Sequence, residues 1–322
     1  MSPEGQTCIT AEKAITRAEA ETCRHRSEKR WYVILIIINI MMIAAVVGGL
    51  AVHADQYRQK CTAYLEQVQE SISEGGISLL SGSADHAENE PSFDVKDLPW
   101  DIKGAGIGIA MIFALYIVTI YLYAEKKANS VRITAQNFPE VYEIVLEQAK
   151  QLGMKKIPEI YVIQGSGILN AFSAFLPNRQ YIIIYTEIFE VAYREHHDTD
   201  TLRFIIGHEM AHIYYGHATL HYNLPILFSR LLPVFGTTAS RAREYSCDRL
   251  AQHLTGTDGI DSMMMLMIDR HLYKQVNVAD YLKHAEEQHG FFLWLSNLLS
   301  DHPVACKRIP ALAKREGSGA LY

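Results

Sequence analysis

The stretch "GHEMAHIYYGH", Gly207–His217, carries three histidines and one glutamate in a chain of 322 residues. The apolar, proline-free residues just ahead of it predict a helix. On a helix, His208 and His212 leave the same face one turn apart, so both imidazoles can approach one zinc ion. Glu209 lies one step round the helix, where its carboxylate can act as a base on a water molecule that the metal activates. The stretch therefore predicts a helix built around a catalytic metal site.

A catalytic zinc site needs a third protein ligand, because its fourth position stays open for water or substrate. The stretch "SRAREYSCD", residues 240–248, places Glu244 and Asp248 four positions apart on a second predicted helix. Because the two carboxylates share one face, one can ligate zinc while the other hydrogen-bonds a ligating imidazole. This acidic pair is the predicted completion of the site.

Two further side chains near these motifs could take part. His217 follows His212 by five positions and so rotates off the shared face, which favours a place on the surface or beside a ligand. Cys247 could supply a thiolate as a rival third ligand. The spacing alone leaves both alternatives open.

Two long apolar runs predict membrane spans. Residues 31–52 contain no charge, and residues 104–124 include the uncharged run Ile107–Ala124. Each run is long enough to cross a bilayer as a helix. A cleaved signal peptide is the alternative for the first run, but the run exceeds the usual apolar core of such peptides and starts only at residue 31. We therefore expect two transmembrane helices and the lipid bilayer as a partner.

The charges around these runs predict the orientation. The segment between them, residues 53–103, is acidic, whereas basic residues precede the first run and follow the second. Positively charged flanks remain on the cytosolic side. We therefore expect a cytosolic N-terminal segment (1–30), an extracytoplasmic acidic loop (53–103) and a cytosolic domain (125–322) on an integral protein of the bacterial plasma membrane.

The bulk composition excludes other classes of protein. A net charge of -6 and a pI near 6.2 give no electrostatic footprint for nucleic acid. Five scattered cysteines without a CxxC pair do not form a disulfide framework and suit a reducing compartment. Nothing in the composition indicates the oligomeric state.

The segment after the second apolar run predicts a mixed fold. Residues 137–153 form an amphipathic helix pattern, and "IPEIYVIQ" and "RQYIIIYTEIFE" are β-rich runs separated by the turn-like "LPNR". Four helices are expected afterwards, at residues 201–219, 240–254, 260–274 and 279–299. The predicted class is α+β, mostly helical, with a small β-sheet. The apolar but proline-broken segment 224–236 either dips into the membrane or packs in the core.

The order of motifs resembles that of the HtpX-like and CAAX-prenyl-protease-type membrane zinc metallopeptidases, a gluzincin family. The matching stretches between about residue 130 and the C-terminus are "FPEVYEIVLEQAKQLG", "NAFSAF", "GHEMAHIYYGH", "SRAREYSCD" and "DHPVACKRIPAL". The chain departs from the family at Asp301, where threonine is common, and in its short segment between the two helical motifs.

The resemblance implies a role for each matched residue. It implies that one catalytic Zn²⁺ is held by His208, His212 and Glu244, with Asp248 orienting a ligand. It implies that Asn170, Ala171 and Phe172 lead into an edge strand that pairs with an extended substrate. It also implies that His302 stabilises the oxyanion and that Arg308 orients the site.

The function expected from these observations is zinc-dependent hydrolysis of peptide bonds in protein or peptide substrates, in membrane-protein quality control or processing. The alternative is a non-catalytic membrane scaffold with a structural zinc site and a partner-binding outer loop. Glu209 favours the enzyme, because a structural site needs no base.

Overall fold

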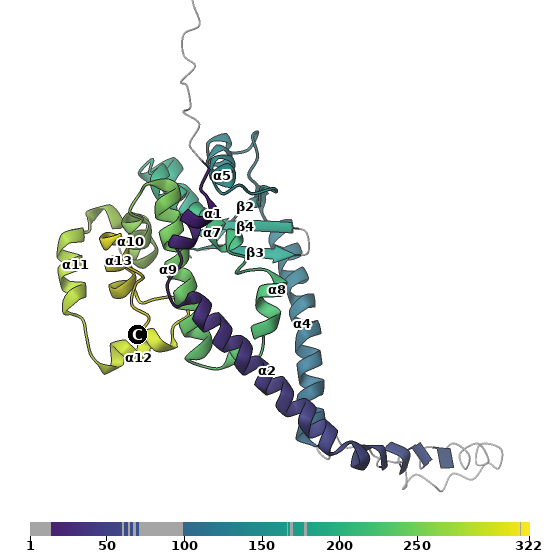
Figure 1. Cartoon of the computed structure of the whole chain (residues 1–322). Coiled ribbons are helices and arrows are strands. Elements are labelled where there is room, and N and C mark those ends of the chain that lie inside the picture. The colour runs from purple at the N-terminus through teal and green to yellow at the C-terminus, as the bar shows by residue number, and fades with distance from the viewer. Residues whose placement is uncertain are drawn as a thin grey trace, which may run out of the picture. The chain divides into compact units, whose positions relative to one another are not determined.

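The computed structural model describes residues 14–59, 61–63, 65–66, 69–70, 99–165, 167, 170–176, 179–315 and 317–322 (Figure 1). The chain divides into two compact units, with boundaries after Asn39 and after Val118. The first unit comprises the N-terminal part of the chain and everything from Thr119 onward, and the second comprises residues 40–118.

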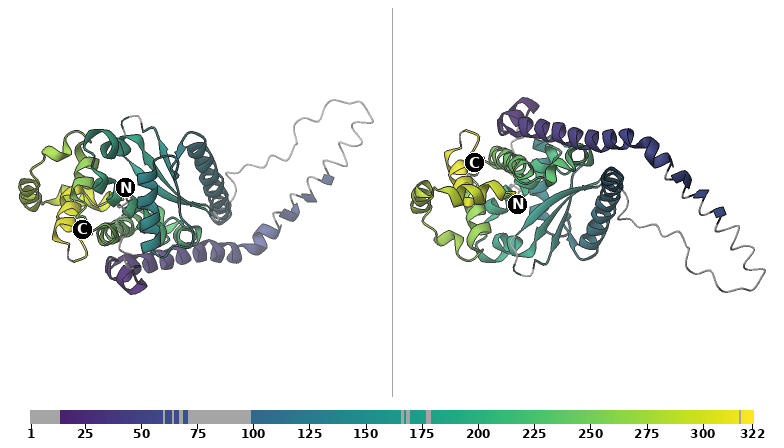
Figure 2. Two further views of the ribbon diagram at one scale, coloured as in Figure 1. Left: turned by 90° about the horizontal axis from the view of Figure 1, so that it is seen from above. Right: turned by 90° about the horizontal axis from the view of Figure 1, so that it is seen from below.

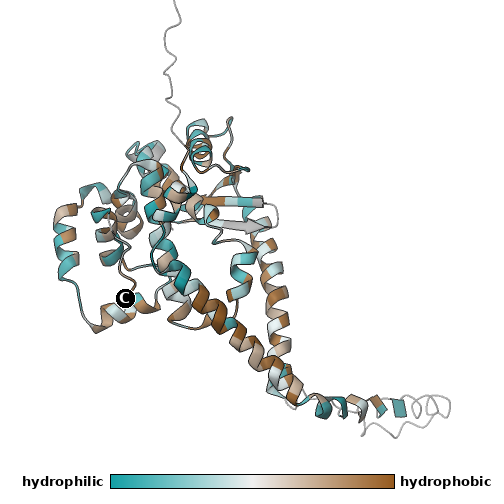
Figure 3. Ribbon diagram, viewed as in Figure 1, coloured by the Kyte–Doolittle hydropathy of each residue, from teal (hydrophilic) through white to brown (hydrophobic). Residues whose placement is uncertain are grey.

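Two long apolar helices contain the expected spans. Helix α2 runs over Glu28–Val52 and α4 over Trp100–Ala128, and both are long and apolar enough to cross a membrane. Their side chains are largely exposed, as at Met41 (66%) and Phe113 (65%), which is the surface that a bilayer would cover. Figure 3 shows the hydrophobic residues along both helices. Residues 71–98, most of the expected acidic loop, lie outside the described residues.

The remaining helices follow in chain order. They are α1 (Arg17–Thr22), α5 (Pro139–Gln151), α6 (Thr186–Glu190), η2 (Val191–Glu195), α7 (Thr199–Tyr214), α8 (Leu220–Asn223), η3 (Leu224–Ile226), η4 (Ser229–Leu231), α9 (Phe235–Thr255), α10 (Ile260–Ile268), η5 (Tyr273–Gln275), α11 (Val278–Glu287), α12 (Phe291–Leu299) and α13 (Ala305–Lys314). With the four-stranded sheet they confirm the mostly helical α+β class.

The sheet has both faces covered. Its strands are β1 (Val131–Arg132), β2 (Glu159–Ile163), β3 (Ala171–Leu176) and β4 (Arg179–Tyr185), in the order β1-β2-β4-β3. Strands β2 and β4 are parallel, and β3 pairs antiparallel to β4 at the edge. Alternate residues point to opposite faces, so Ile182 and Ile184 join the main core while Tyr181 and Ile183 pack near Tyr123 of α4. Figure 2 shows the ribbon in two further views.

Helices α7 and α9 pack side by side in the main core, and α7 also lies against β3 and β4. Their facing sides are fully buried, as at Phe204, Met210 and Leu250. This arrangement holds the two predicted metal motifs on neighbouring rigid helices.

Two predicted helices differ from the structure. The helix expected over 260–274 ends at Ile268, before Asp269 (φ 143°). The helix expected over 279–299 is broken into α11 and α12: the chain leaves the helix at Gln288, and Gly290 (φ 124°) precedes α12 in a conformation that glycine tolerates. Residues 14–30 pack on the unit that contains α7 and α9. Ile15 N–H donates to Gln151 O (2.8 Å), and the Tyr215 hydroxyl donates to Ala20 O (2.7 Å).

Candidate metal centre

The three predicted ligands come together between α7 and α9. His208 Nε2 lies 3.2 Å from His212 Nε2 and 3.3 Å from Glu244 Oε2, and His212 Nε2 lies 3.4 Å from Glu244 Oε1. The side chains are largely buried, with Glu244 and His208 only 5% and 8% exposed. Helical spacing on α7 aligns the imidazoles, and α9 supplies the carboxylate across the helix pair.

These distances fit a tetrahedral zinc site. Ligand atoms bound at about 2.0–2.1 Å on neighbouring corners of a tetrahedron are about 3.3–3.4 Å apart. The three measured separations, 3.2, 3.3 and 3.4 Å, match that edge length. Two imidazoles and one carboxylate are also the donor set of a catalytic rather than a structural zinc site. The residues present therefore fit one zinc ion with a position left for water or substrate.

A buried ion pair supports this group from the C-terminal side. The Arg308 guanidinium on α13 binds Asp248 with Nε and Nη2, at 2.7 Å each, and Nη2 lies 3.2 Å from Glu244 Oε2. Asp248 Oδ1 in turn lies 2.9 Å from His208 Nδ1. Burial alone would raise the pKa of Asp248, but Arg308 and His208 hold it at about 2. A permanent carboxylate thus stands behind a ligand imidazole.

The same carboxylates act on the His208 ring. Burial alone would lower the pKa of His208, but Asp248 and Glu244 raise it to about 10. Nε2 of His208 is the nitrogen that faces His212 and Glu244, so a metal ion would have to displace a proton from it.

The other expected site residues lie on α7, on β3 and in the segment after α12. His302 Nε2 is 3.6 Å from Glu244 Oε2, and its side chain is 66% exposed, so it borders the site from the solvent side. Glu209 follows His208 on α7 and is 7% exposed. Strand β3, which begins at Ala171 directly after Asn170, is the sheet edge and lies beside α7. Phe172 is the second residue of this edge strand.

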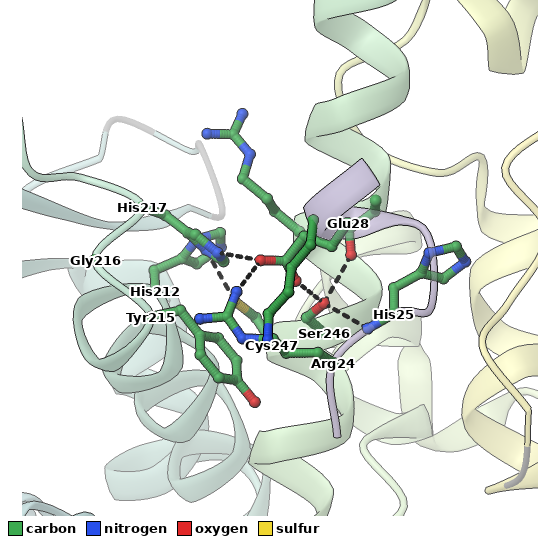
Figure 4. A network of polar contacts seen from close by, with 12 residues as sticks. Arg24, His25, Glu28, His212, Tyr215, Gly216, His217, Ser246 and Cys247 are labelled. Atoms are coloured by element: carbon green, nitrogen blue, oxygen red, sulfur yellow. Dashed lines mark hydrogen bonds and ion pairs between the residues drawn. The ribbon is translucent and has the colours of Figure 1, made fainter. Parts of the chain in front are cut away.

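The structure shows where His217 lies, which the spacing in the sequence had left open between the surface and a place beside a ligand. His217 is 4% exposed, which excludes the surface alternative, and its Nδ1 lies 3.1 Å from His212 Nδ1. Its Nε2 lies 3.1 Å from Glu28 Oε1 (Figure 4). Burial lowers the pKa of His217 to about 3, although Glu28 opposes this, so the ring is neutral at pH 7.

A metal bound at His212 would determine the tautomers of both rings. If His212 uses Nε2 for a metal, its Nδ1 carries the proton and donates to the bare Nδ1 of His217. The remaining proton of neutral His217 is then on Nε2 and faces the Glu28 carboxylate. Each candidate metal-binding histidine therefore has a carboxylate behind it: Asp248 contacts His208 directly, and Glu28 contacts His212 through His217.

Glu28 is itself firmly held, at the first residue of α2. It is 2% exposed and contacts the Arg24 guanidinium and the Ser246 hydroxyl of α9 (Figure 4). The sequence gives no signal for this role of Glu28, because a glutamate between basic residues and an apolar run has the pattern of a solvated membrane flank.

Cys247 contacts His217 and is not part of the group formed by His208, His212 and Glu244. Its Sγ is 3.6 Å from His217 Nδ1, and with His212 and His217 it forms a second group of ligand-type atoms. Burial and the surrounding carboxylates raise the pKa of the Cys247 thiol well above its usual value. Because the thiolate is the metal-binding form, this environment favours the carboxylate site over a thiolate site.

The comparisons agree with this geometry. The family model described as Peptidase family M48 matches residues 135–227 and 219–316, more than half of the chain. The chain therefore belongs to peptidase family M48, whose members are metallopeptidases, and the two apolar helices indicate a membrane-associated one. A comparison with curated proteins found no match.

Proposed function

We propose that this protein is a zinc-dependent endopeptidase, anchored in the membrane by α2 and α4, that hydrolyses peptide bonds of protein substrates. The observation that carries the proposal is the near-equilateral group of His208, His212 and Glu244 ligand atoms, 3.2–3.4 Å apart, with a glutamate next in sequence to one ligand. Residues 125–322 form the peptidase domain, and residues 14–30 pack on it.

Zinc held by these three residues would supply a Lewis acid that polarises the scissile carbonyl and lowers the pKa of water. Glu209 accepts the proton of the attacking water and passes it to the leaving amine. The edge of β3 aligns the substrate as an added strand, because its outer backbone groups can pair with an extended peptide. His302 donates a hydrogen bond to the oxygen on which negative charge develops.

Positioning residues complete the site. Arg308 and Asp248 hold the ring of His208 and the carboxylate of Glu244, and the pair of His217 and Glu28 holds the ring of His212. Such partners fix the ring orientation and raise the basicity of a ligand.

We place the protein in a bacterial plasma membrane, and the basic flanks of its apolar helices support a cytosolic peptidase domain. Membrane anchoring supports membrane proteins as substrates, in quality control or processing. The scaffold alternative is not favoured, because it leaves Glu209 without a role beside a catalytic donor set.

The test is cleavage of an unfolded protein such as casein by the purified full-length protein in detergent. We expect cleavage that a chelator abolishes and that added zinc restores. Glu209→Gln should retain one zinc per chain but lose activity by orders of magnitude, since only the base is removed. Chelator-resistant cleavage, or undiminished turnover by Glu209→Gln, would refute the mechanism.

A further inference from the structure

Helix α12 carries aromatic side chains that the rest of the protein leaves exposed. Phe291 and Phe292 are 63% and 81% exposed, and Trp294 and Leu299 are 40% and 53% exposed. Phe291 is in ring contact with both Phe292 and Trp294, so the aromatic residues form one continuous patch. A contiguous apolar patch of this kind marks an interaction surface rather than a scatter of single residues.

A second apolar surface belongs to the proline-broken segment 224–236. Leu231 is 63% exposed, and Leu224 and Phe235 are 40% and 38% exposed. The backbone of this segment folds into short 3-10 turns, η3 and η4, rather than a spanning helix.

Contacts with α2 place this segment at membrane depth. Leu35 is 1% exposed and packs with Ile226 and Ala239. Asn39 is 4% exposed, and its Oδ1 accepts hydrogen bonds from the backbone N–H groups of Phe228 (3.0 Å) and Ser229 (3.3 Å). A polar side chain in an apolar span and an irregular backbone at the same depth each need a partner inside the protein. Here each satisfies the other.

The depth follows from helix geometry. The apolar run of α2 begins at Trp31, and Asn39 lies eight residues further, which is about 12 Å along the helix at 1.5 Å per residue. A segment hydrogen-bonded to Asn39 therefore lies alongside the membrane-embedded part of α2. Arg230 limits how far the segment enters, because its charged end must reach the polar headgroups.

The two apolar surfaces are linked through the start of α9. Phe235, the first residue of α9, makes an edge-on ring contact with Trp31, with centroids 6.2 Å apart. Two residues on, the Thr237 hydroxyl donates to Leu298 O of α12 (2.6 Å). The start of α9 therefore contacts both α12 and α2, and it connects the aromatic patch on α12 to segment 224–236.

We propose that the exposed side of α12, together with segment 224–236, is a membrane-binding surface that enters the same leaflet as the first half of α2. The occupant is the lipid bilayer, because part of this surface is bonded to residues of the span itself. Large aromatic residues with a tryptophan among them suit the boundary between headgroups and acyl chains.

This surface also determines where the candidate metal site lies relative to the bilayer. His302 follows the last residue of α12 by three positions and lies 3.6 Å from Glu244 Oε2. Immersion of α12 therefore holds the mouth of the metal site at the bilayer surface. The favoured substrates are then polypeptide segments next to a membrane span, an inference that rests on the proposed peptidase function.

The first experiment measures depth directly. Trp31→Phe with Trp100→Phe leaves Trp294 as the single tryptophan of the full-length chain. In liposomes of lipids with brominated acyl chains, we expect strong quenching of its fluorescence and weak quenching by aqueous iodide. Strong iodide quenching without bromine quenching would overturn the proposal. Protection from both quenchers that depends on protein concentration would also overturn it, because it would indicate contact between copies.

The second experiment separates the surface from the chemistry. One cleavable sequence is offered as a soluble peptide in detergent and as a segment fused directly to a transmembrane helix in liposomes. Phe291→Ser with Phe292→Ser should leave the soluble rate unchanged and lower the rate on the fused segment about tenfold, because orientation toward the bilayer sets the local substrate concentration. Leu272→Ser is the matched control, because it removes an exposed apolar side chain (51%) outside the proposed surface. It should leave both rates unchanged.

The outcomes distinguish the two proposals. If the wild-type protein cleaves neither substrate in a zinc-dependent way, the peptidase function fails. If the wild type cleaves both, while the phenylalanine variant matches it on the fused segment and Trp294 is not quenched by brominated lipid, the membrane surface alone is refuted.

Discussion

Glu28 Oε1 lies 3.1 Å from Nε2 of His217, although the two residues are 189 positions apart in the chain. Glu28 is the first residue of the apolar helix α2, and His217 contacts the metal-ligand candidate His212. The first residue of the candidate membrane helix α2 is therefore part of the support of the candidate metal site. A displacement of Glu28 would change the position of His212 through two contacts, Glu28 with His217 and His217 with His212.

Removal of this support should weaken zinc binding. Glu28→Ala and His217→Ala should each lower zinc affinity about 10- to 100-fold, as expected when the partner of a ligand is lost. Glu28→Gln should have a smaller effect, because its amide oxygen can still accept the proton of His217. Zinc affinity is measured by competition with a chelator on the full-length proteins.

Glu21→Gln is the control for that series. Glu21 lies in the same N-terminal segment and pairs with Lys29 at the surface (2.6 Å). Thermal unfolding in excess chelator shows whether a variant is damaged apart from metal. Zinc affinity of Glu28→Ala equal to that of Glu21→Gln would contradict the role of Glu28.

Glu244 should prove to be the third ligand. Glu244→Ala should release zinc and abolish activity, because its carboxylate completes the 3.2–3.4 Å group. Cys247→Ser should retain most zinc and activity, since the thiol contacts His217 and is not part of the group formed by His208, His212 and Glu244. Metal content of the purified proteins decides between them. Full zinc occupancy in Glu244→Ala, with loss of zinc in Cys247→Ser, would assign the site to the thiolate.

The Asp248 and Arg308 pair should act on affinity and not on ligand identity. Asp248→Asn should weaken zinc binding about 10- to 100-fold, because an amide holds the His208 ring less strongly than a carboxylate. It also leaves the buried Arg308 guanidinium without its bidentate partner, so the unfolding temperature should fall. Substitution of cobalt for zinc gives a visible spectrum that reports the ligand set. An unchanged affinity would argue against this support.

The sequence predicted the parts of the site that depend on local periodicity. His208, His212, Glu244 and Asp248 could be grouped because helical spacing fixes which side chains share a face. The contact between Glu28 and His217 could not be found in this way, since it depends on how the N-terminal segment packs. The break between α11 and α12 was not predicted either. The residues on both sides of Gly290 favour a helix, and nothing in their pattern indicates the positive φ that Gly290 adopts in the folded chain.

The membrane topology offers an independent test. With a cytosolic peptidase domain, an impermeant thiol reagent applied to intact cells should label Cys61 and not Cys306. Cys61 is exposed and Cys306 is partly buried, so Cys306 must also be shown to react after the cells are opened. Labelling of Cys306 in intact cells, without labelling of Cys61, would reverse the proposed orientation.

Acid should weaken the structure that carries the metal ligands, through Asp198 at the start of α7. Its carboxylate accepts from Thr201 N–H (3.0 Å) and binds Lys274 Nζ (2.6 Å). Burial would raise the pKa of Asp198, but Lys274 and the hydrogen bonds lower it from 3.8 to about 2. A lowered pKa in the folded state means that the carboxylate stabilises the fold above pH 3.8, and that this contribution is lost as the pH falls toward 2.

Asp198→Asn removes the titrating group and keeps an oxygen that can cap the helix. Its free energy of unfolding should be about 2 kcal/mol below that of the wild type at pH 7, and the difference should shrink between pH 4 and pH 2. Asp261→Asn is the matched control, because Asp261 binds the same Lys274 Nζ (2.5 Å) from a more exposed position, and it should cost less than about 1 kcal/mol. Denaturant unfolding in detergent across this pH range measures both variants. A deficit of Asp198→Asn that is the same at pH 7 and pH 3 would show that the charge of Asp198 does not stabilise α7.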